Sequence, residues 1–151
     1  MLQNEEETLA LAGVLAGVLA AGDLVGLEGG LGAGKTTFAR GAIHALAVPA
    51  ETAVTSPTFA LLHQYQGRLP IAHADFYRLE SDAELEELGV DELLEDGAVL
   101  FVEWGRKFPW VASRASLWVE LEIVSDDVRR VRLRPQGKRG EELIAGLPSL
   151  L

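Results

Sequence analysis

LVGLEGGLGAGKTTF, residues 24–38, is the most informative stretch of the chain. Its first five residues suit a strand, and helical character resumes at Lys35. Between them, Gly29 to Thr36 match the pattern G-x-x-x-x-G-K-[ST], which in a strand–loop–helix setting indicates a phosphate-binding loop, or P-loop. The glycines let the backbone turn tightly, so that successive N–H groups point at phosphate oxygens near the positive end of the helix. We therefore predict a nucleotide-phosphate site here.

The polar residues at the end of this loop have separate predicted roles. We expect Lys35 to reach the β and γ phosphates, the Thr36 hydroxyl to bind Mg²⁺, and Thr37 to contact the α phosphate. The plain alternative is a glycine-rich turn that binds nothing, but a lysine buried in such a turn would be costly.

Helix, strand and turn signals continue on both sides of the P-loop. Asn4 is a suitable N-cap for a first helix that Gly22 ends, and Ser81 opens a capping box before an acidic helical stretch that Gly89 divides in two. Alternating apolar residues over 117–133 indicate an antiparallel hairpin with Glu and Arg side chains facing one another. The other predicted elements are a helix over 35–47, strands over 24–28, 59–66, 69–75 and 98–102, and a short helix in the tail from Lys138, packed on the sheet.

Strands that alternate with helices and end in a hairpin predict an α/β fold. We expect a P-loop NTPase-like three-layer sandwich, with a mostly parallel central sheet to which antiparallel strands are added. The length of 151 residues is about that of one domain. Residues 1–151 are therefore expected to form a single P-loop ATPase domain.

Composition excludes several classes of protein. The chain has no cysteine, which rules out disulfides and thiolate zinc sites and fits the cytoplasm. The apolar run over residues 9–21 is too short to span a bilayer, so no membrane role is expected. A net charge of −10 disfavours unaided binding to nucleic acid, so any contact with RNA should depend on a partner.

Two carboxylates are candidates for the metal ion and the attacking water. Glu103 follows the apolar run over residues 98–102, and Asp75 follows residues 71–74, so each ends a predicted strand. A P-loop enzyme needs one such carboxylate near its metal and a group that positions the nucleophile. The sequence leaves open which residue has which role. A solvent-exposed strand end and a turn aspartate are the structural alternatives.

Other residues near these strands are weaker candidates. His73 shares the side of Asp75, but a lone histidine is more often structural. Hydroxyls in Thr55-Ser-Pro-Thr58 could sense a γ phosphate or form a plain turn. The acidic stretch over 80–96 could be a solvated helix face or a docking surface. Trp104 and Trp110 favour packing over chemistry. The candidate charge-stabilising arginines are Arg40, Arg78 and Arg106.

Taken together, five segments resemble the TsaE (YjeE) family of bacterial ATPases, which act in forming the threonylcarbamoyladenosine modification of tRNA. The segments are LEGGLGAGKTTFARG, VTSPTF, HADFYRL, ELEELGVDELL and LFVEWG, in this order over about two thirds of the chain. Beyond Phe108 the resemblance fades. Gly30 stands where the family often has aspartate or asparagine, which should matter little for a cradle of backbone N–H groups.

This resemblance implies a slow, Mg²⁺-dependent ATPase that supports the TsaD–TsaB heterodimer, with tRNA contacted only indirectly or within that complex. The implied nucleotide-binding residues are Gly32, Ala33, Gly34, Lys35, Thr36 and Thr37, and the implied metal ligands are Thr36 and Glu103. The functionally important aspartate of the family falls on Asp75 and its tryptophan on Trp104. Thr8 or its neighbours and the Arg129-Arg130 region align with family segments that approach the adenosine end of the nucleotide. The predicted catalytic residues are Lys35, Asp75 and Glu103.

Two other functions share a P-loop. A small-molecule kinase would also need an acceptor pocket and an arginine-bearing lid, and the sequence has no arginine-rich insertion to build one. A nucleotide-dependent switch without hydrolysis would use the same loop, metal ion and Ser-Pro-Thr segment. Substituting Glu103 or Asp75 in a protein that retains its nucleotide affinity would separate hydrolysis from switching.

Overall fold

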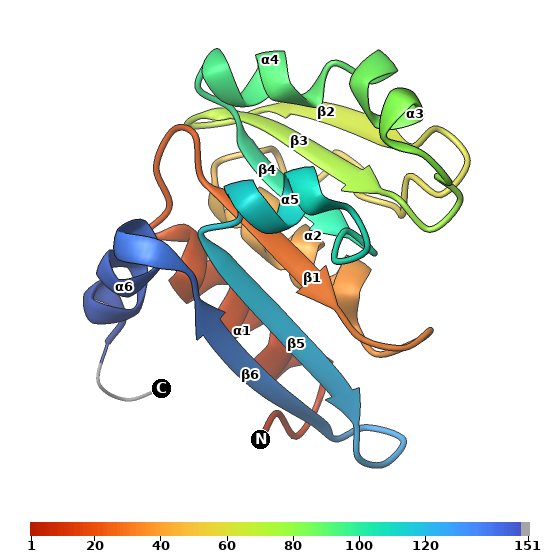
Figure 1. The fold of residues 1–151 in the computed structure, drawn as a ribbon. Coiled ribbons are helices and arrows are strands. Elements are labelled where there is room, and N and C mark those ends of the chain that lie inside the picture. Colours follow the sequence, from red (N-terminus) through yellow and green to blue (C-terminus); the bar gives the residue numbers. More distant parts are fainter. Residues whose placement is uncertain (149–151) are drawn as a thin grey trace.

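The computed structural model describes residues 1–148 as helices packed on both faces of one six-stranded sheet (Figure 1). The sheet order is β2-β3-β4-β1-β5-β6. The elements are, in chain order, α1 (Glu5–Ala16), β1 (Leu24–Glu28), α2 (Lys35–Ala45), β2 (Leu62–Gln66), β3 (Pro70–Asp75), α3 (Asp82–Glu87), α4 (Val90–Glu95), β4 (Val99–Glu103), α5 (Pro109–Arg114), β5 (Leu117–Ile123), β6 (Arg129–Pro135) and α6 (Gly137–Gly146).

The four central strands are parallel, and each edge of the sheet carries an antiparallel strand. β1 lies between β4 and β5, and β3 pairs with the other side of β4. β2 joins β3 and β6 joins β5 in antiparallel pairs. Parallel strands need crossover connections, which the helices supply. The predicted mostly parallel sheet with antiparallel additions is confirmed.

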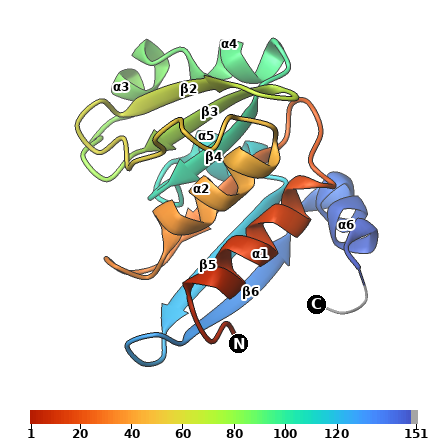
Figure 2. The ribbon, with the colours of Figure 1, turned by 180° about the vertical axis from the view of Figure 1, so that it is seen from behind.

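Each face of the sheet has its own apolar core, which makes the three layers. α1 and α2 lie side by side on one face (Figure 2), where Leu15 and Phe38 share an apolar cluster with Val99 and Phe101 of β4. α3, α4 and α5 cover part of the other face through Leu85, Val90 and Val111. The Asp and Glu side chains of α3 and α4 are exposed, as expected for a solvated helix face.

Several predicted boundaries need correction. Residues 59–61 were predicted as strand, but they form a turn in which the Leu61 N–H donates to the Pro57 carbonyl and Leu61 adopts a positive φ of 69°. Phe59 is consequently 86% exposed. The first helix ends at Ala16 with Gly17 as its C-cap, earlier than the predicted stop at Gly22. Helix α5 was not predicted at all. In the tail, α6 starts at Gly137, and residues 149–151 of the predicted helix lie outside the described part.

Gly26 in the central strand β1 has no room for a side chain. A Cβ there would lie 2.2 Å from the buried indole of Trp118 on β5. We expect Gly26→Ala to push the indole aside and destabilise the fold by about 1–3 kcal/mol. The melting temperature should then fall by roughly 3–10 °C in a thermal unfolding experiment. Gly30→Ala is the matched control because a Cβ at Gly30 meets nothing within 4 Å. Equal losses in both variants would contradict this packing argument.

None of the helices in residues 1–148 combines the length and the apolar character needed to cross a membrane.

Candidate nucleotide-binding site

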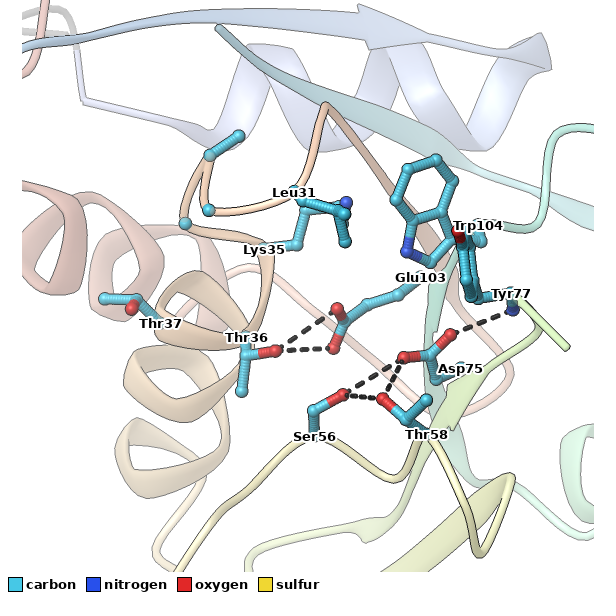
Figure 3. A pocket seen from close by; sticks show the side chains of 13 residues that line it. Leu31, Lys35, Thr36, Thr37, Ser56, Thr58, Asp75, Tyr77, Glu103 and Trp104 are labelled. Atoms are coloured by element: carbon cyan, nitrogen blue, oxygen red, sulfur yellow. Dashed lines mark hydrogen bonds between the residues drawn. The ribbon is translucent and has the colours of Figure 1, made fainter. Parts of the chain in front are cut away.

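The predicted site residues meet in one pocket at the carboxyl ends of β1, β3 and β4. The P-loop follows β1, Asp75 ends β3 and Glu103 ends β4, and these two carboxylates are register partners on neighbouring strands. The pocket has a volume of about 340 Å³. Its wall includes the predicted loop residues Gly32, Ala33, Gly34, Lys35, Thr36 and Thr37, together with both carboxylates (Figure 3). Crevices at this end of parallel strands are the usual ligand sites of open α/β sheets.

The P-loop backbone depends on glycine. Gly29, Gly32 and Gly34 have φ values of 151°, 78° and 108°, in the region that L side chains rarely adopt. Gly34 is the N-cap of α2 and has no side-chain cap, so the first N–H groups of this helix have no side-chain acceptor of their own. An anion at this position would meet unpaired N–H groups and the positive end of the helix dipole.

Lys35 is held inside the pocket. Its Nζ donates to the carbonyl oxygens of Gly29 and Gly30, at 2.5 and 3.3 Å, and lies 3.7 Å from the centre of the Trp104 ring. The side chain is 6% exposed. Burial lowers the pKa of Lys35 below its ordinary value, while nearby carboxylates, Glu103 first among them, act in the opposite direction. The ammonium is thus desolvated and aimed at the loop.

Thr36 and Glu103 face one another across the pocket floor. The Thr36 hydroxyl lies 3.2 and 3.1 Å from the two carboxylate oxygens of Glu103 (Figure 3). On its other side Glu103 accepts a hydrogen bond of 2.6 Å from Nε2 of His73. Glu103 is 3% exposed, so this carboxylate is buried and held by two partners. The structural alternative of a solvent-exposed strand end is therefore wrong.

Asp75 is tied to the predicted γ-phosphate-sensing segment. Its Oδ2 accepts hydrogen bonds of 3.0 Å from the hydroxyls of both Ser56 and Thr58, and its Oδ1 accepts one of 2.9 Å from the Tyr77 N–H. The Ser-Pro-Thr segment is thus not a plain surface turn, because its hydroxyls line the pocket and bind a buried carboxylate (Figure 3).

Two aromatic side chains form part of the wall. Trp104 and Tyr77 have ring centres 5.0 Å apart. Trp104 has a positive φ of 59°, which is uncommon for a bulky residue. From the residue alone, packing is favoured over chemistry for Trp104, whereas the family resemblance places a functional tryptophan there, and the ring does lie over Lys35. Tyr77 was missed altogether. Its position two residues beyond Asp75 was the available signal. Trp110 lies away from the pocket, on α5.

The three candidate arginines do not enter the pocket. Arg40 pairs with Glu5 and Arg106 with Glu120, at 2.6 and 2.8 Å. Arg78 stacks over the ring of Phe59 at 4.9 Å. Among the described residues that line the pocket, Lys35 is the only lysine or arginine. Positive charge inside the site is therefore limited to one ammonium.

A smaller pocket of about 160 Å³ shares Gly32, Ala33, Gly34 and Thr37 of the P-loop with the first pocket. Thr8, Thr37 and Arg129 contribute to its wall, which places two of the residues aligned with the adenosine end beside the loop. Arg129 donates to the carbonyl oxygens of Ala33 and Gly32, at 3.1 and 3.2 Å. Arg130 points elsewhere and pairs with Glu122 at 3.0 Å.

Fold and site together define an α/β protein of the P-loop NTPase-like class. A family model described as "Threonylcarbamoyl adenosine biosynthesis protein TsaE" matches residues 2–131 of the chain. The chain therefore belongs to the TsaE family, whose members take part in threonylcarbamoyladenosine biosynthesis. The resemblance drawn from the five sequence segments is confirmed.

Individual relatives agree with this assignment. The chain is similar to the TsaE protein of Bacillus subtilis, with 38% identity over 141 residues that cover 93% of this chain and 87% of that protein. It is 42% identical over 140 residues to the TsaE protein of Mycobacterium tuberculosis, covering 86% of this chain and 82% of that one. A crystal structure of Bacillus subtilis YdiB has a TM-score of 0.72 at 32% identity, covering 94% and 87% of the two chains.

Proposed function

We propose that this chain is an Mg²⁺-dependent ATPase whose slow hydrolysis supports the TsaD–TsaB complex in threonylcarbamoyladenosine modification of tRNA. The observation that carries the proposal is the convergence of Lys35, Thr36, Asp75 and Glu103 in one pocket beneath the P-loop. Each supplies a group that phosphoryl transfer requires, namely a cation, metal-binding oxygens and an acceptor for water.

The residues present fit Mg²⁺ and a nucleotide phosphate. Mg²⁺ prefers oxygen ligands and keeps several waters or phosphate oxygens in its shell. The Thr36 hydroxyl and the Glu103 carboxylate, in hydrogen-bond contact with each other, offer such oxygens and would hold the ion. Bound there, Mg²⁺ would supply charge neutralisation at the phosphate oxygens.

Lys35 and Asp75 would act on the transferred phosphoryl group and on water. Lys35 rests on loop carbonyl oxygens, and phosphate oxygens are stronger acceptors for its ammonium. Asp75 already accepts three hydrogen bonds, whereas a carboxylate offers about four lone-pair sites. The remaining site can accept a hydrogen bond from water and orient its oxygen toward the phosphate.

The pocket also explains why a partner would be needed. Because no arginine lines the pocket among the described residues, the free protein would stabilise the developing charge incompletely. Leu31 and Tyr77, in the pocket wall, and Phe59 beside Thr58 are 74%, 51% and 86% exposed, which suits contact with another protein. TsaD–TsaB is the partner that family membership favours, and tRNA would be reached through it because the chain itself is strongly acidic.

Asp75→Asn tests hydrolysis against the switch alternative. The bonds from Ser56 and Thr58 to Asp75 give that alternative a physical basis, because the same contacts could report an occupied γ-phosphate site. We expect Asp75→Asn to lower partner-stimulated hydrolysis by about 10- to 100-fold, with ATP affinity within roughly threefold of wild type. The measurement is phosphate release with and without TsaD–TsaB, beside equilibrium nucleotide binding.

Asp96→Asn, at the exposed end of α4, is the control and should behave as wild type. A wild-type protein that binds ATP but releases no phosphate, even with TsaD–TsaB, would favour the switch and reject the ATPase. A wild-type protein that does not bind ATP would reject both.

A further inference from the structure

His73 is the most deeply buried ionisable residue beside the site. It lies in the middle of β3, paired with His63 on β2 and Phe101 on β4, and its side chain is 0% exposed. It does not line the pocket, so a ligand there would not touch it. Its one polar contact among the described residues is the 2.6 Å hydrogen bond from Nε2 to Oε2 of Glu103.

The other ring nitrogen of His73 has no partner. Nδ1 is the one buried side-chain nitrogen or oxygen in residues 1–148 that lacks a hydrogen bond. An ionised carboxylate accepts hydrogen bonds and donates none, so the proton of the contact belongs to Nε2. Nδ1 is then a buried acceptor without a hydrogen bond, which is unfavourable by itself. An apolar residue would pack on β3 without this penalty, so the contact with Glu103 is what the histidine contributes.

Glu103 is oriented from two sides as a result. The Thr36 hydroxyl approaches its carboxylate from the pocket, and His73 approaches Oε2 from the sheet interior. Only the first of these partners can be drawn to a ligand, since His73 is sealed off from the pocket. The bond from His73 therefore fixes the side-chain orientation of Glu103 independently of what the pocket holds.

We propose that His73 is a positioning residue that holds the Glu103 carboxylate toward Thr36 in the orientation that binds Mg²⁺. This inference rests on the proposed function, because it assigns Glu103 to the metal. Partners that orient a metal ligand commonly change metal affinity by about 10- to 100-fold when they are removed. The expected defect is confined to the metal-dependent part of nucleotide binding.

Two amide substitutions separate positioning from packing. The side-chain nitrogen of glutamine reaches about as far from the backbone as Nε2 of histidine, whereas that of asparagine reaches only as far as Nδ1. His73→Gln can therefore keep a hydrogen bond to Glu103, and His73→Asn cannot. Both variants put a polar amide in the same buried place, so they form a matched pair.

The test measures the affinity for a fluorescent ATP analogue in Mg²⁺ and in EDTA, with thermal melts as a check of folding. In His73→Asn the gain in affinity on adding Mg²⁺ should fall by about 10-fold or more, with binding in EDTA unchanged. His73→Gln should recover most of that gain. In a Glu103→Gln background, His73→Asn should have no further effect, because the two residues act as one unit.

The outcomes distinguish this inference from the proposed function. If the wild type gains no affinity from Mg²⁺, the proposed metal site fails and the role of His73 fails with it. If the wild type gains affinity and His73→Asn gains as much, only the positioning role is overturned. Folded His73→Gln that matches a defective His73→Asn would assign the effect to packing and would also overturn it. If His73→Asn does not fold, His73→Leu, which can pack on β3 but makes no hydrogen bond to Glu103, takes its place in the comparison with His73→Gln. The same outcomes then support or overturn the positioning role.

Discussion

Lys35→Ala should remove most ATP binding and lower TsaD–TsaB-stimulated hydrolysis by roughly 100- to 1,000-fold, the effect of losing one preorganised charge at a transition state. The reason lies in how the ammonium is held, 6% exposed and bonded to two carbonyl oxygens of the loop that would surround the phosphates. Alanine leaves these carbonyl oxygens facing phosphate without a cation between them. Equilibrium binding and phosphate release measure the two losses separately.

Lys138→Ala is the control for the loss of one positive charge. Lys138 is exposed on α6 and touches neither pocket beside the P-loop. Its removal should leave binding and turnover unchanged. Thermal melts of Lys35→Ala check folding separately, because alanine also removes the hydrogen bonds of Lys35 to Gly29 and Gly30. A Lys35→Ala protein with wild-type affinity and turnover would reject the P-loop site as a whole.

Glu103→Gln should lower hydrolysis by roughly 100-fold or more while ATP still binds. The substitution preserves shape, but it removes the negative charge that faces Thr36 and places an amide opposite the donor Nε2 of His73. Affinity for ATP in EDTA should stay near that of wild type, because the P-loop backbone is untouched. The affinity gained from Mg²⁺ should be largely lost. Single-turnover phosphate release, at saturating nucleotide, isolates the chemical step.

Glu122→Gln provides the surface comparison, because it also neutralises a glutamate that accepts a hydrogen bond from a basic side chain. Glu122 pairs with Arg130 on the exposed hairpin, with 59% of the glutamate side chain accessible. Exposed ion pairs of this kind contribute little to the stability of a protein. A full hydrolysis rate in Glu103→Gln would transfer the metal role away from this residue and leave Asp75 as the remaining strand-end carboxylate.

The parts of the site that sequence could predict are those set by local pattern and by parallel register. The P-loop has a fixed spacing of glycines, lysine and threonine, so it could be found without any knowledge of tertiary contacts. Asp75 and Glu103 could be placed at one edge of the sheet because both follow apolar runs of strand length. Parallel strands then bring such residues together. In the structure they are register partners.

Other parts depend on contacts that no local pattern encodes. The bond from His73 to Glu103 joins residues 30 positions apart and needs the side-chain directions on two strands. The exclusion of Arg40, Arg78 and Arg106 from the pocket follows from ion pairs and stacking partners chosen by tertiary packing. The prediction of strand at Phe59 is wrong because the turn closed by Pro57 and Leu61 overrides the strand preference of aromatic residues.

Arg129 has a practical consequence for attaching labels and affinity tags. Its backbone pairs with Leu2 in both directions, at 2.7 and 2.8 Å, while its side chain binds the P-loop carbonyl oxygens of Gly32 and Ala33. A bulky fluorophore on residues 1–3 or on the turn between β5 and β6 would therefore disturb the contacts through which Arg129 holds the phosphate loop. Helix α6 lies at the opposite end of the hairpin (Figure 2), so a dye on its exposed face would report on the molecule without disturbing nucleotide capture.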